Sequence, residues 1–393
     1  MNPKKLCIIT GSRAEWGLFY PLAGKIRDDG SFDLSIVATG AHLSDKHGLT
    51  YREIEGDGFG ITGRAEIPLP EDTAGSLAVS IGEAVKRLTR AVKAADPDLV
   101  LLLGDRFEIF AAAVSCLTLR KPIAHIHGGE LTEGSLDDAF RHSITKMAHL
   151  HFVSTETYRE RVIRMGEDPG RVFNVGAMGI DNIRGARLLT KDEFQEEAGF
   201  RLGKRNLMVT FNPMTAAEGS SSTAQLDNLL EALDLLEETR LIFTMPNPDI
   251  YSDVIASRLD DYASRTSGKS VVFTSLGRIL YLSALQFVDA VVGNSSSGII
   301  EAPSFGIPTI NIGDRQKGRV RALSVIDCAE DRGSISKAIE KGLSDDFRKV
   351  CREAENPYGE GNASRKILDI LKGIDADKEL LRKRFYDGEI AAA

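Results

Sequence analysis

Residues 74–105, AGSLAVSIGEAVKRLTRAVKAADPDLVLLLGD, place a helical pattern directly before a short apolar run. The apolar residues of the first part share the three-to-four spacing of one helix face: Leu77, Ile81, Val85, Leu88 and Val92. The run LVLLLGD (99–105) is short and apolar on both alternating faces, which is typical of a strand buried on both sides. A helix followed by such a strand predicts a parallel sheet wound by right-handed crossovers.

The same alternation extends along the whole chain. Apolar, strand-like runs lie at 6–10, 34–40, 99–105, 122–129, 150–155 and 172–176, then at 206–213, 240–246, 270–275, 290–296 and 308–313. Helical stripes lie near 16–27, 74–95, 136–148, 156–166, 223–237, 252–264, 278–287, 333–343 and 362–372. Six strands followed by five predict an α/β protein with two Rossmann-like halves. We expect domains at 1–178 and 179–374, and a C-terminal helix within 375–393 that returns to the first domain.

Composition limits the partners and the location. Acidic residues outnumber basic ones by 57 to 49 in 393 residues, which gives a net charge of −8. Nucleic acid is therefore not expected as the main partner, because phosphate binding needs a basic surface. No apolar run approaches the roughly 18 residues that span a bilayer, and the four cysteines have no CxxC spacing. We expect a cytoplasmic protein with reduced thiols and no membrane partner.

Ionisable residues gather at the ends of two predicted strands in the first half. Asp105 ends one strand, the next ends in HIHGGE (125–130), and the following helix opens with SLDDAFRH (135–142). Ligands of a doubly wound sheet bind at the carboxyl ends of its strands, so we expect these groups to meet there. The alternative for Asp105 is a helix N-cap. The predicted acid–base residues are Asp105, His127, Glu130, Asp137, Arg141 and His142.

Histidines also allow a metal site. Five of the seven lie between 125 and 151, in two His-x-His pairs whose members share a strand face. At most one member of each pair lies at the open end of its strand, so we expect the other to be a buried imidazole. The one GxGxxG match, at 58–63, runs into two prolines instead of a helix. We therefore predict neither a metal nor a dinucleotide cofactor.

A turn in the first half can bind an anion. TGSRAEWG (10–17) follows the first strand, where Gly11 or Ser12 can expose backbone N–H groups and Arg13 supplies a guanidinium for a phosphate or carboxylate. The alternative is a helix cap followed by a surface arginine.

The second half contains a stronger anion motif. VVGNSSSGIIEAPSFG (291–306) is a strand, a polar turn and a short helix. Ser295 and Ser296 offer hydroxyls and backbone N–H groups to a diphosphate at the helix N-terminus, and Glu301 can accept two ribose hydroxyls. Arg315 follows in the next turn and adds positive charge. The alternative is a serine N-cap with an incidental glutamate.

Eight motifs in this order resemble those of the UDP-N-acetylglucosamine 2-epimerase family, most closely its hydrolysing branch: GSRAE, TGAHL, GDRFE, HIHGGE, LDD-x-x-RH-x-ITKM-x-H-x-HF, VG-x-x-GID, GNSS-x-G-x-x-E and GDRQ-x-GR. They span nearly the whole chain. The resemblance implies two Rossmann-like domains facing across a cleft, as in GT-B glycosyltransferases, and a homodimer or higher oligomer. By position it assigns UDP binding to Arg13, Asn212, Ser295, Ser296, Gly298, Glu301 and Arg315. Two positions depart from the family: some members have Glu in place of His127, and many have His in place of Asn212.

The resemblance also implies a reaction. UDP-N-acetylglucosamine would be converted to N-acetylmannosamine and UDP, for sialic-acid synthesis, by elimination to 2-acetamidoglucal and hydration with inversion at C2. Asp105 and Asp137 would be catalytic carboxylates, and no metal or redox cofactor is needed. The alternative substrate is UDP-2,4-diacetamido-2,4,6-trideoxyglucose, of legionaminic-acid synthesis. A GT-B glycosyltransferase and a silent UDP-sugar-binding module are further alternatives, but neither uses the acid–base residues.

Overall fold

The chain folds into two compact units. The computed structural model describes residues 3–71, 73, 75–133, 135–213, 219–246, 252–375 and 379–388, without the side chains of 219–221. Unit 1 comprises Met1–Glu130, Asp137–Asn182 and Gly361–Ala393, and unit 2 comprises Leu131–Leu136 and Ile183–Glu360. In the described residues, no helix is long and apolar enough to cross a membrane.

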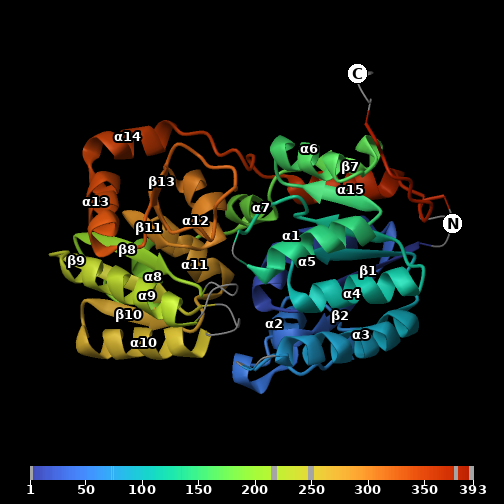
Figure 1. Ribbon diagram of the computed structural model, residues 1–393, viewed down its shortest axis with the longest axis horizontal. Coiled ribbons are helices and arrows are strands. Elements are labelled where there is room, and N and C mark those ends of the chain that lie inside the picture. The colour runs from blue at the N-terminus through green and yellow to red at the C-terminus, as the bar shows by residue number, and fades with distance from the viewer. Residues whose placement is uncertain are drawn as a thin grey trace. The chain divides into compact units, whose positions relative to one another are not determined.

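Unit 1 is built on a seven-stranded parallel sheet of order β3-β2-β1-β4-β5-β6-β7 (Figure 1). Its strands are β1 (Lys4–Thr10), β2 (Phe32–Thr39), β3 (Gly63–Ala65), β4 (Leu99–Leu103), β5 (Ile123–Ile126), β6 (Leu150–Val153) and β7 (Val172–Asn174). Its α-helices are α1 (Arg13–Asp29), α2 (Tyr51–Gly56), α3 (Ser76–Ala95), α4 (Phe107–Thr118), α5 (Leu136–Met147), α6 (Glu156–Arg164), α7 (Met178–Gly185) and α15 (Ala363–Gly373). Short 3₁₀ helices are η1 (Gly40–Leu43), η2 (Asp45–His47) and η3 (Pro169–Arg171).

Alternate residues of the central strands of unit 1 pack into two separate cores. Leu6 and Ile8 of β1 face a cluster formed with α1 and α15, whereas Cys7 and Ile9 face one formed with α3 and α4. This two-sided burial is why the strands are apolar throughout. The strand and helix pattern predicts α15 in the second domain, but this helix packs on α1 in unit 1.

Unit 2 is a second parallel sheet, of order β10-β9-β8-β11-β12-β13. Its strands are β8 (Arg205–Thr210), β9 (Thr239–Thr244), β10 (Ser270–Phe273), β11 (Ala290–Gly293), β12 (Thr309–Ile312) and β13 (Val325–Cys328). Its helices are α8 (Lys191–Ala198), α9 (Gly219–Asp234), α10 (Ser252–Arg265), α11 (Gly277–Leu285), α12 (Ser296–Ile300), η4 (Ala302–Phe305), α13 (Arg332–Leu343) and α14 (Asp345–Glu353). One core contains residues of α9, α10 and α13, and the other contains residues of α8 and α11. The α/β class with two parallel-sheet domains is therefore confirmed.

Strand register brings the predicted site loops to one edge of the first sheet. Ile8 pairs with Leu101, and Leu103 pairs with Ile126. The chain therefore leaves β1, β4 and β5 at nearly the same level. The loops that begin at Gly11, Gly104 and His127 all start from this edge.

The C-terminal segment differs from the sequence-based prediction. The pattern predicts one amphipathic helix over 376–390, but in its described part, 379–388, a turn is followed by irregular backbone. Its polar groups are instead satisfied by unit 1. Arg171 donates to the carbonyl oxygens of Glu379 and Leu380, and the Tyr386 N–H donates to the Gly166 carbonyl. Local periodicity cannot reveal these partners, because they lie about two hundred residues away in the chain.

Candidate active site

Asp105 and Arg141 form the centre of the candidate site in unit 1. Asp105 lies in the loop after β4, and one of its carboxylate oxygens accepts a hydrogen bond from Arg141 of α5. The Arg141 side chain is only 3% exposed, whereas that of Asp105 is 21% exposed. Arg141 also donates to the Glu130 carbonyl at 3.0 Å. The buried Arg141 guanidinium therefore fixes the partly exposed Asp105 carboxylate and the backbone of Glu130.

Glu130 is held by residues from two further segments. His127 has a left-handed backbone, with φ of 65°, which turns the chain sharply after β5. Its Nε2 accepts from the Met178 N–H at 3.2 Å, so its Nδ1 carries the hydrogen that bonds Glu130 Oε1 at 2.8 Å. The Ser154 hydroxyl donates to the same oxygen at 2.9 Å. Because both ring nitrogens are engaged, this geometry favours a positioning role for His127 over the predicted catalytic one.

The remaining acid–base candidates lie on α5. Asp138 contacts both Arg141 Nη1 and His142 Nε2 at 3.5 Å, as the helical spacing predicts. Asp137 is half-buried at the second position of the helix. The Nδ1 atom of His142 is buried and has no hydrogen-bond partner within the described part of the chain. The structure thus gathers all six predicted residues on two adjoining segments of the β5–α5 region and on the loop after β4.

The other histidines are structural. Burial lowers the pKa of His125 to about 3, and its Nε2 donates to the Gly104 carbonyl at 2.8 Å. Burial likewise lowers the pKa of His149 to about 4, and its Nδ1 accepts from the Ile123 N–H. His151 is fully buried and donates to Glu167 at 2.9 Å. Among the residues that the structure describes, no group of three or more side chains is arranged to hold a metal ion.

The turn after β1 uses its backbone groups internally. The Ser12 side chain caps α1 by accepting from the Glu15 N–H, and the Gly11 N–H donates to Glu15 Oε2 at 2.7 Å. The prediction that Gly11 or Ser12 exposes N–H groups to an anion is therefore wrong for Gly11. Arg13 is the first residue of α1 and is partly exposed, with Glu53 3.6 Å away.

The predicted nucleotide turn of unit 2 is organised around a residue that the sequence analysis did not select, Asn294. Its Oδ1 accepts from the Asn212 N–H at 2.7 Å, and its Nδ2 donates to the Asn212 carbonyl at 2.8 Å. The Asn294 carbonyl accepts from Arg315 at 3.2 Å and from Gln316 at 2.8 Å. Asn294 therefore brings three loops together, and its polar side chain directly after a buried strand was the available signal.

The helix that follows the serine turn is short, as the sequence predicts. Ser295 is the N-cap of α12, accepting from the Ser297 N–H, and Ser296 is the first residue of that five-residue helix. So short a helix has little macrodipole, which reduces the predicted contribution of the helix to anion binding. Gly298 is explained by packing, because a Cβ there would lie 2.8 Å from Thr309.

Glu301 belongs to a small hydrogen-bonded chain. The Ser297 hydroxyl donates to Glu301 Oε2 at 2.6 Å, and Tyr281 in turn contacts the Ser297 hydroxyl. Burial raises the pKa of Glu301, which Ser297 partly offsets. The Tyr281 and Ser297 hydroxyls thus orient the carboxylate that the sequence analysis assigned to ribose.

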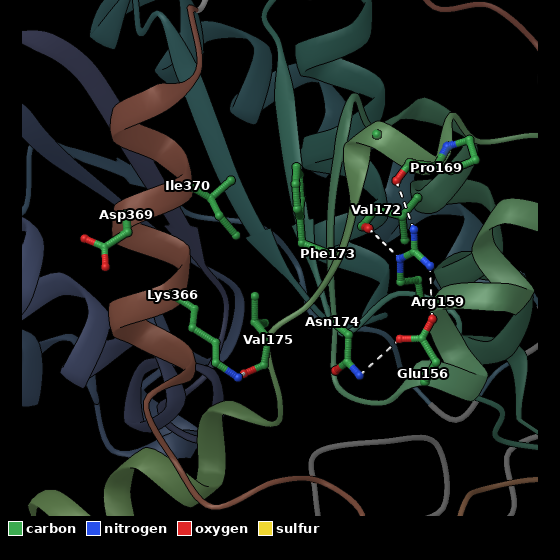
Figure 2. Close-up of a pocket in the computed structure, with 11 residues that line it drawn as sticks. Glu156, Arg159, Pro169, Val172, Phe173, Asn174, Val175, Lys366, Asp369 and Ile370 are labelled. Atoms are coloured by element: carbon green, nitrogen blue, oxygen red, sulfur yellow. Dashed lines mark hydrogen bonds and ion pairs between the residues drawn. The ribbon is translucent and has the colours of Figure 1, made fainter.

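A separate groove of about 640 Å³ lies beside the edge strand β7 in unit 1. Figure 2 shows Arg159 reaching the Val172 carbonyl and Glu156, with Lys366 near the Val175 carbonyl on the other side. None of the predicted site residues lines it. Basic side chains that occupy the carbonyls of an edge strand prevent further strand pairing, so we interpret the groove as a protected sheet edge.

Comparisons with known proteins agree with this architecture. The family model for UDP-N-acetylglucosamine 2-epimerase matches residues 24–372. The chain belongs to the UDP-N-acetylglucosamine 2-epimerase family. This membership confirms the resemblance drawn from the eight motifs.

Three curated relatives match over almost the full length. A GDP/UDP-N,N'-diacetylbacillosamine 2-epimerase (hydrolyzing) of Campylobacter jejuni is 40% identical, over 98% of this chain and 100% of the relative. A polysialic acid biosynthesis protein P7 of Escherichia coli is 36% identical, over 98% and 97%. A UDP-N,N'-diacetylbacillosamine 2-epimerase (hydrolyzing) of Legionella pneumophila is 35% identical, over 97% and 98%.

Solved structures show the same fold. The UDP-GlcNAc 2-epimerase of Methanocaldococcus jannaschii, in complex with UDP-GlcNAc and UDP, superposes with a TM-score of 0.77 at 19% identity, covering 94% of this chain and 100% of that one. At this identity the likeness establishes the fold of the epimerase family and no more.

Proposed function

We propose that this protein is a hydrolysing 2-epimerase whose substrate is UDP-2,4-diacetamido-2,4,6-trideoxyglucose, the sugar also called N,N'-diacetylbacillosamine. The observation that carries the proposal is full-length similarity, at 40% and 35% identity, to two hydrolysing epimerases named for that sugar. These relatives favour the substrate that the sequence analysis held as the alternative over UDP-N-acetylglucosamine. The polysialic acid relative, at 36% identity, keeps UDP-N-acetylglucosamine as the second candidate.

The residues of unit 1 suit the chemistry at C1 and C2. The C2 proton of a pyranose is weakly acidic, so the C1–O bond to the nucleotide must break ahead of proton removal. The partly exposed Asp105 carboxylate stabilises the positive charge that develops at C1. A carboxylate base then removes the C2 proton to give a 2-acetamidoglucal. We assign that step to Glu130 or Asp137, with His127 and Arg141 as positioning residues.

The second half of the reaction returns a proton to C2. Water adds to C1 of the glucal, and an acid protonates C2. This proton arrives on the face opposite to the one from which the C2 proton was removed, so the free sugar leaves with C2 inverted. Two proton-transfer groups on opposite faces are needed for this inversion. Three ionisable side chains lie on the β5–α5 segment: Glu130, Asp137 and His142. We propose that the two proton-transfer groups are among them.

The serine turn of unit 2 suits the leaving nucleotide. The diphosphate is offered hydroxyls by Ser295 and Ser296 and a guanidinium by Arg315. Asn294 holds these loops together through its bonds to Arg315 and to the backbone of Asn212. The negative charge that appears on the diphosphate as the C1–O bond breaks is stabilised there. Glu301, oriented by Ser297, accepts the ribose hydroxyls.

Parallel turnover of three nucleotide sugars tests the substrate. UDP-2,4-diacetamido-2,4,6-trideoxyglucose, its GDP counterpart and UDP-N-acetylglucosamine are each offered to the purified protein, and nucleotide release and the free sugar are followed by NMR. We expect the UDP-diacetamido sugar to give the highest kcat/KM, with the C2-inverted free sugar as product. A higher kcat/KM on UDP-N-acetylglucosamine would replace the proposed substrate, and a product that remains attached to UDP would place the protein among non-hydrolysing epimerases.

A further inference from the structure

Two buried carboxyl groups lie beneath the candidate site of unit 1. Glu15 is 5% exposed on α1, and Glu108 is fully buried on α4. Glu15 follows Arg13 by two residues, and Glu108 follows Asp105 by three. The two glutamates therefore belong to the turns that hold one predicted anion-binding residue and one predicted catalytic carboxylate.

Both carboxyl groups contact Gly11. The Gly11 N–H donates to Glu15 Oε2 at 2.7 Å. A Cβ at Gly11 would lie 2.5 Å from Glu108 Cγ and 2.6 Å from its Oε1, and a Cβ at Gly40 would lie 3.1 Å from the same Oε1. Only glycine leaves room for a carboxyl group here, so the structure places two acids where the turns after β1 and β2 meet α4.

Among the residues that the structure describes, one cation is bonded to these two acids. Arg106 Nε donates to Glu108 Oε1 at 2.8 Å and is the cation bonded to the pair. Arg13 lies near Glu53 instead, at 3.6 Å. On the α1 side, the Thr10 hydroxyl is bonded to His42, whose pKa burial lowers to about 4, so that imidazole is neutral.

Each carboxyl group also retains an oxygen with no partner. Glu15 Oε1 and Glu108 Oε2 are both buried and accept no hydrogen bond from any described residue. Two ionised carboxylates cannot bond each other, because neither has a hydrogen to donate. One added proton turns one of them into a donor. Burial first, and the neighbouring charge of Glu108 second, raise the pKa of Glu15 to about 8, which agrees with a neutral acid at this position.

We propose that Glu15 keeps its proton, donates it in a hydrogen bond to Glu108, and forms with Glu108 a positioning pair that joins the turn after β1 to the turn after β4. The pair fixes Arg13 relative to Asp105. This role rests on the proposed function, because only in that reaction do both residues act on one substrate. When the proton is lost, two buried charges face a single guanidinium, and their repulsion separates the two turns.

The matched variants are Glu15→Gln and Glu15→Ala. Gln has the size of the protonated acid and donates an N–H to Glu108, but it cannot lose that hydrogen near neutral pH. We expect wild-type kcat/KM to fall about tenfold per pH unit above pH 8. We expect kcat/KM of Glu15→Gln to fall less than threefold between pH 7 and pH 9. We expect kcat of Glu15→Ala to be at least about tenfold below the wild-type value at every pH, since one hydrogen bond to a charged group is worth about that factor. The exposed Glu66→Gln is the control and should follow the wild type.

Thermal unfolding separates this inference from the proposed function. The folded protein keeps the proton up to about pH 8, whereas the unfolded chain loses it near 4.5, so the pair stabilises the fold below pH 4.5 and its contribution is lost as pH rises to 8. The Tm of the wild type should therefore fall relative to Glu15→Gln across this range, even if no nucleotide sugar is turned over. Parallel Tm profiles of wild type and Glu15→Gln would overturn the retained proton on Glu15. If the Tm difference between wild type and Glu15→Gln changes with pH but their kcat/KM values fall identically above pH 8, the positioning role would be overturned.

Discussion

Replacing Glu167 with glutamine should destabilise unit 1 in a pH-dependent way. The Glu167 carboxylate is 3% exposed and accepts from His151 Nε2 at 2.9 Å, Lys146 Nζ at 2.6 Å and Lys383 Nζ at 2.7 Å. Burial by itself raises the pKa of Glu167, but these three donors outweigh it and lower the pKa from 4.5 to about 2. The ionised carboxylate is therefore strongly favoured in the folded protein.

The size of the effect follows from that pKa. At roughly 1.4 kcal/mol per pH unit, lowering the pKa from 4.5 to about 2 corresponds to about 3 kcal/mol of folding free energy at neutral pH. Burial lowers the pKa of Lys383 to about 8 although Lys383 pairs with Glu167. With the uncharged glutamine in place of Glu167, the buried Lys383 ammonium loses its counter-charge. Breaking a buried pair from one side costs about 3–5 kcal/mol, in the same range. We expect Glu167→Gln to cost about 3 kcal/mol.

The single tryptophan makes the measurement specific to unit 1. Trp16 is the one tryptophan of the sequence, and it is 2% exposed in the core of that unit. Urea unfolding, followed by Trp16 fluorescence, should give the full difference of about 3 kcal/mol in unfolding free energy between wild type and Glu167→Gln at pH 7. A carboxylate of lowered pKa stabilises above pH 4.5 and loses this effect as pH falls toward 2, so the difference should shrink below pH 4.5. Glu160→Gln, at an exposed ion pair with Arg164, is the control and should change nothing measurable.

Two results would refute this reasoning. One is a Glu167→Gln variant within about 1 kcal/mol of the wild type at pH 7, which would mean that the three donors do not favour the charged carboxylate. The other is a difference that is equal at pH 7 and pH 3.5, which would mean that the loss comes from packing rather than from charge.

Three further predictions concern the two sheets and their site loops. Asp105→Asn should lower kcat by about 10²–10⁴-fold in nucleotide release without unfolding, because it removes the carboxylate that we propose stabilises the developing charge; wild-type turnover would contradict that role. Gly293→Ala should abolish soluble, folded protein, because its Cβ would lie 1.9 Å from a β8 carbonyl oxygen at a φ of 138°, whereas Gly17→Ala has open space and should express normally. Tyr281→Phe should raise KM about fivefold with kcat within about twofold, because the Ser297 hydroxyl that orients Glu301, the proposed ribose-binding carboxylate, loses a partner; an unchanged KM would remove Tyr281 from the proposed site.

The sequence predicted the central strands of both sheets and missed one edge strand of each sheet. Central strands such as β1 and β4 are apolar on both faces, and that burial is visible in the sequence as an uninterrupted apolar run. The edge strands β3 and β13 are short and partly exposed, with Arg64 and Asp327 inside them, so they resemble loops. Pairing with a neighbouring strand, rather than their own composition, makes them strands.

The site was predictable in its residue types more than in its contacts. Motif spacing placed Asp105 and Arg141 together because helix and strand periodicity fix which groups reach one sheet edge. The engagement of both His127 nitrogens depends on Met178, which is about fifty residues away and carries no signal. Glu15 and Glu108 each look like ordinary helix-start glutamates, and only the fold shows that both contact Gly11.

In the proposed reaction, a C2 proton is removed and replaced while the C1–O bond to the nucleotide is broken. The most direct measurement is turnover of UDP-2,4-diacetamido-2,4,6-trideoxyglucose in heavy water, with the free sugar examined by proton NMR. We expect free UDP and a free sugar inverted at C2 that carries deuterium at that carbon. A free sugar with its original C2 hydrogen, or with unchanged configuration at C2, would contradict it.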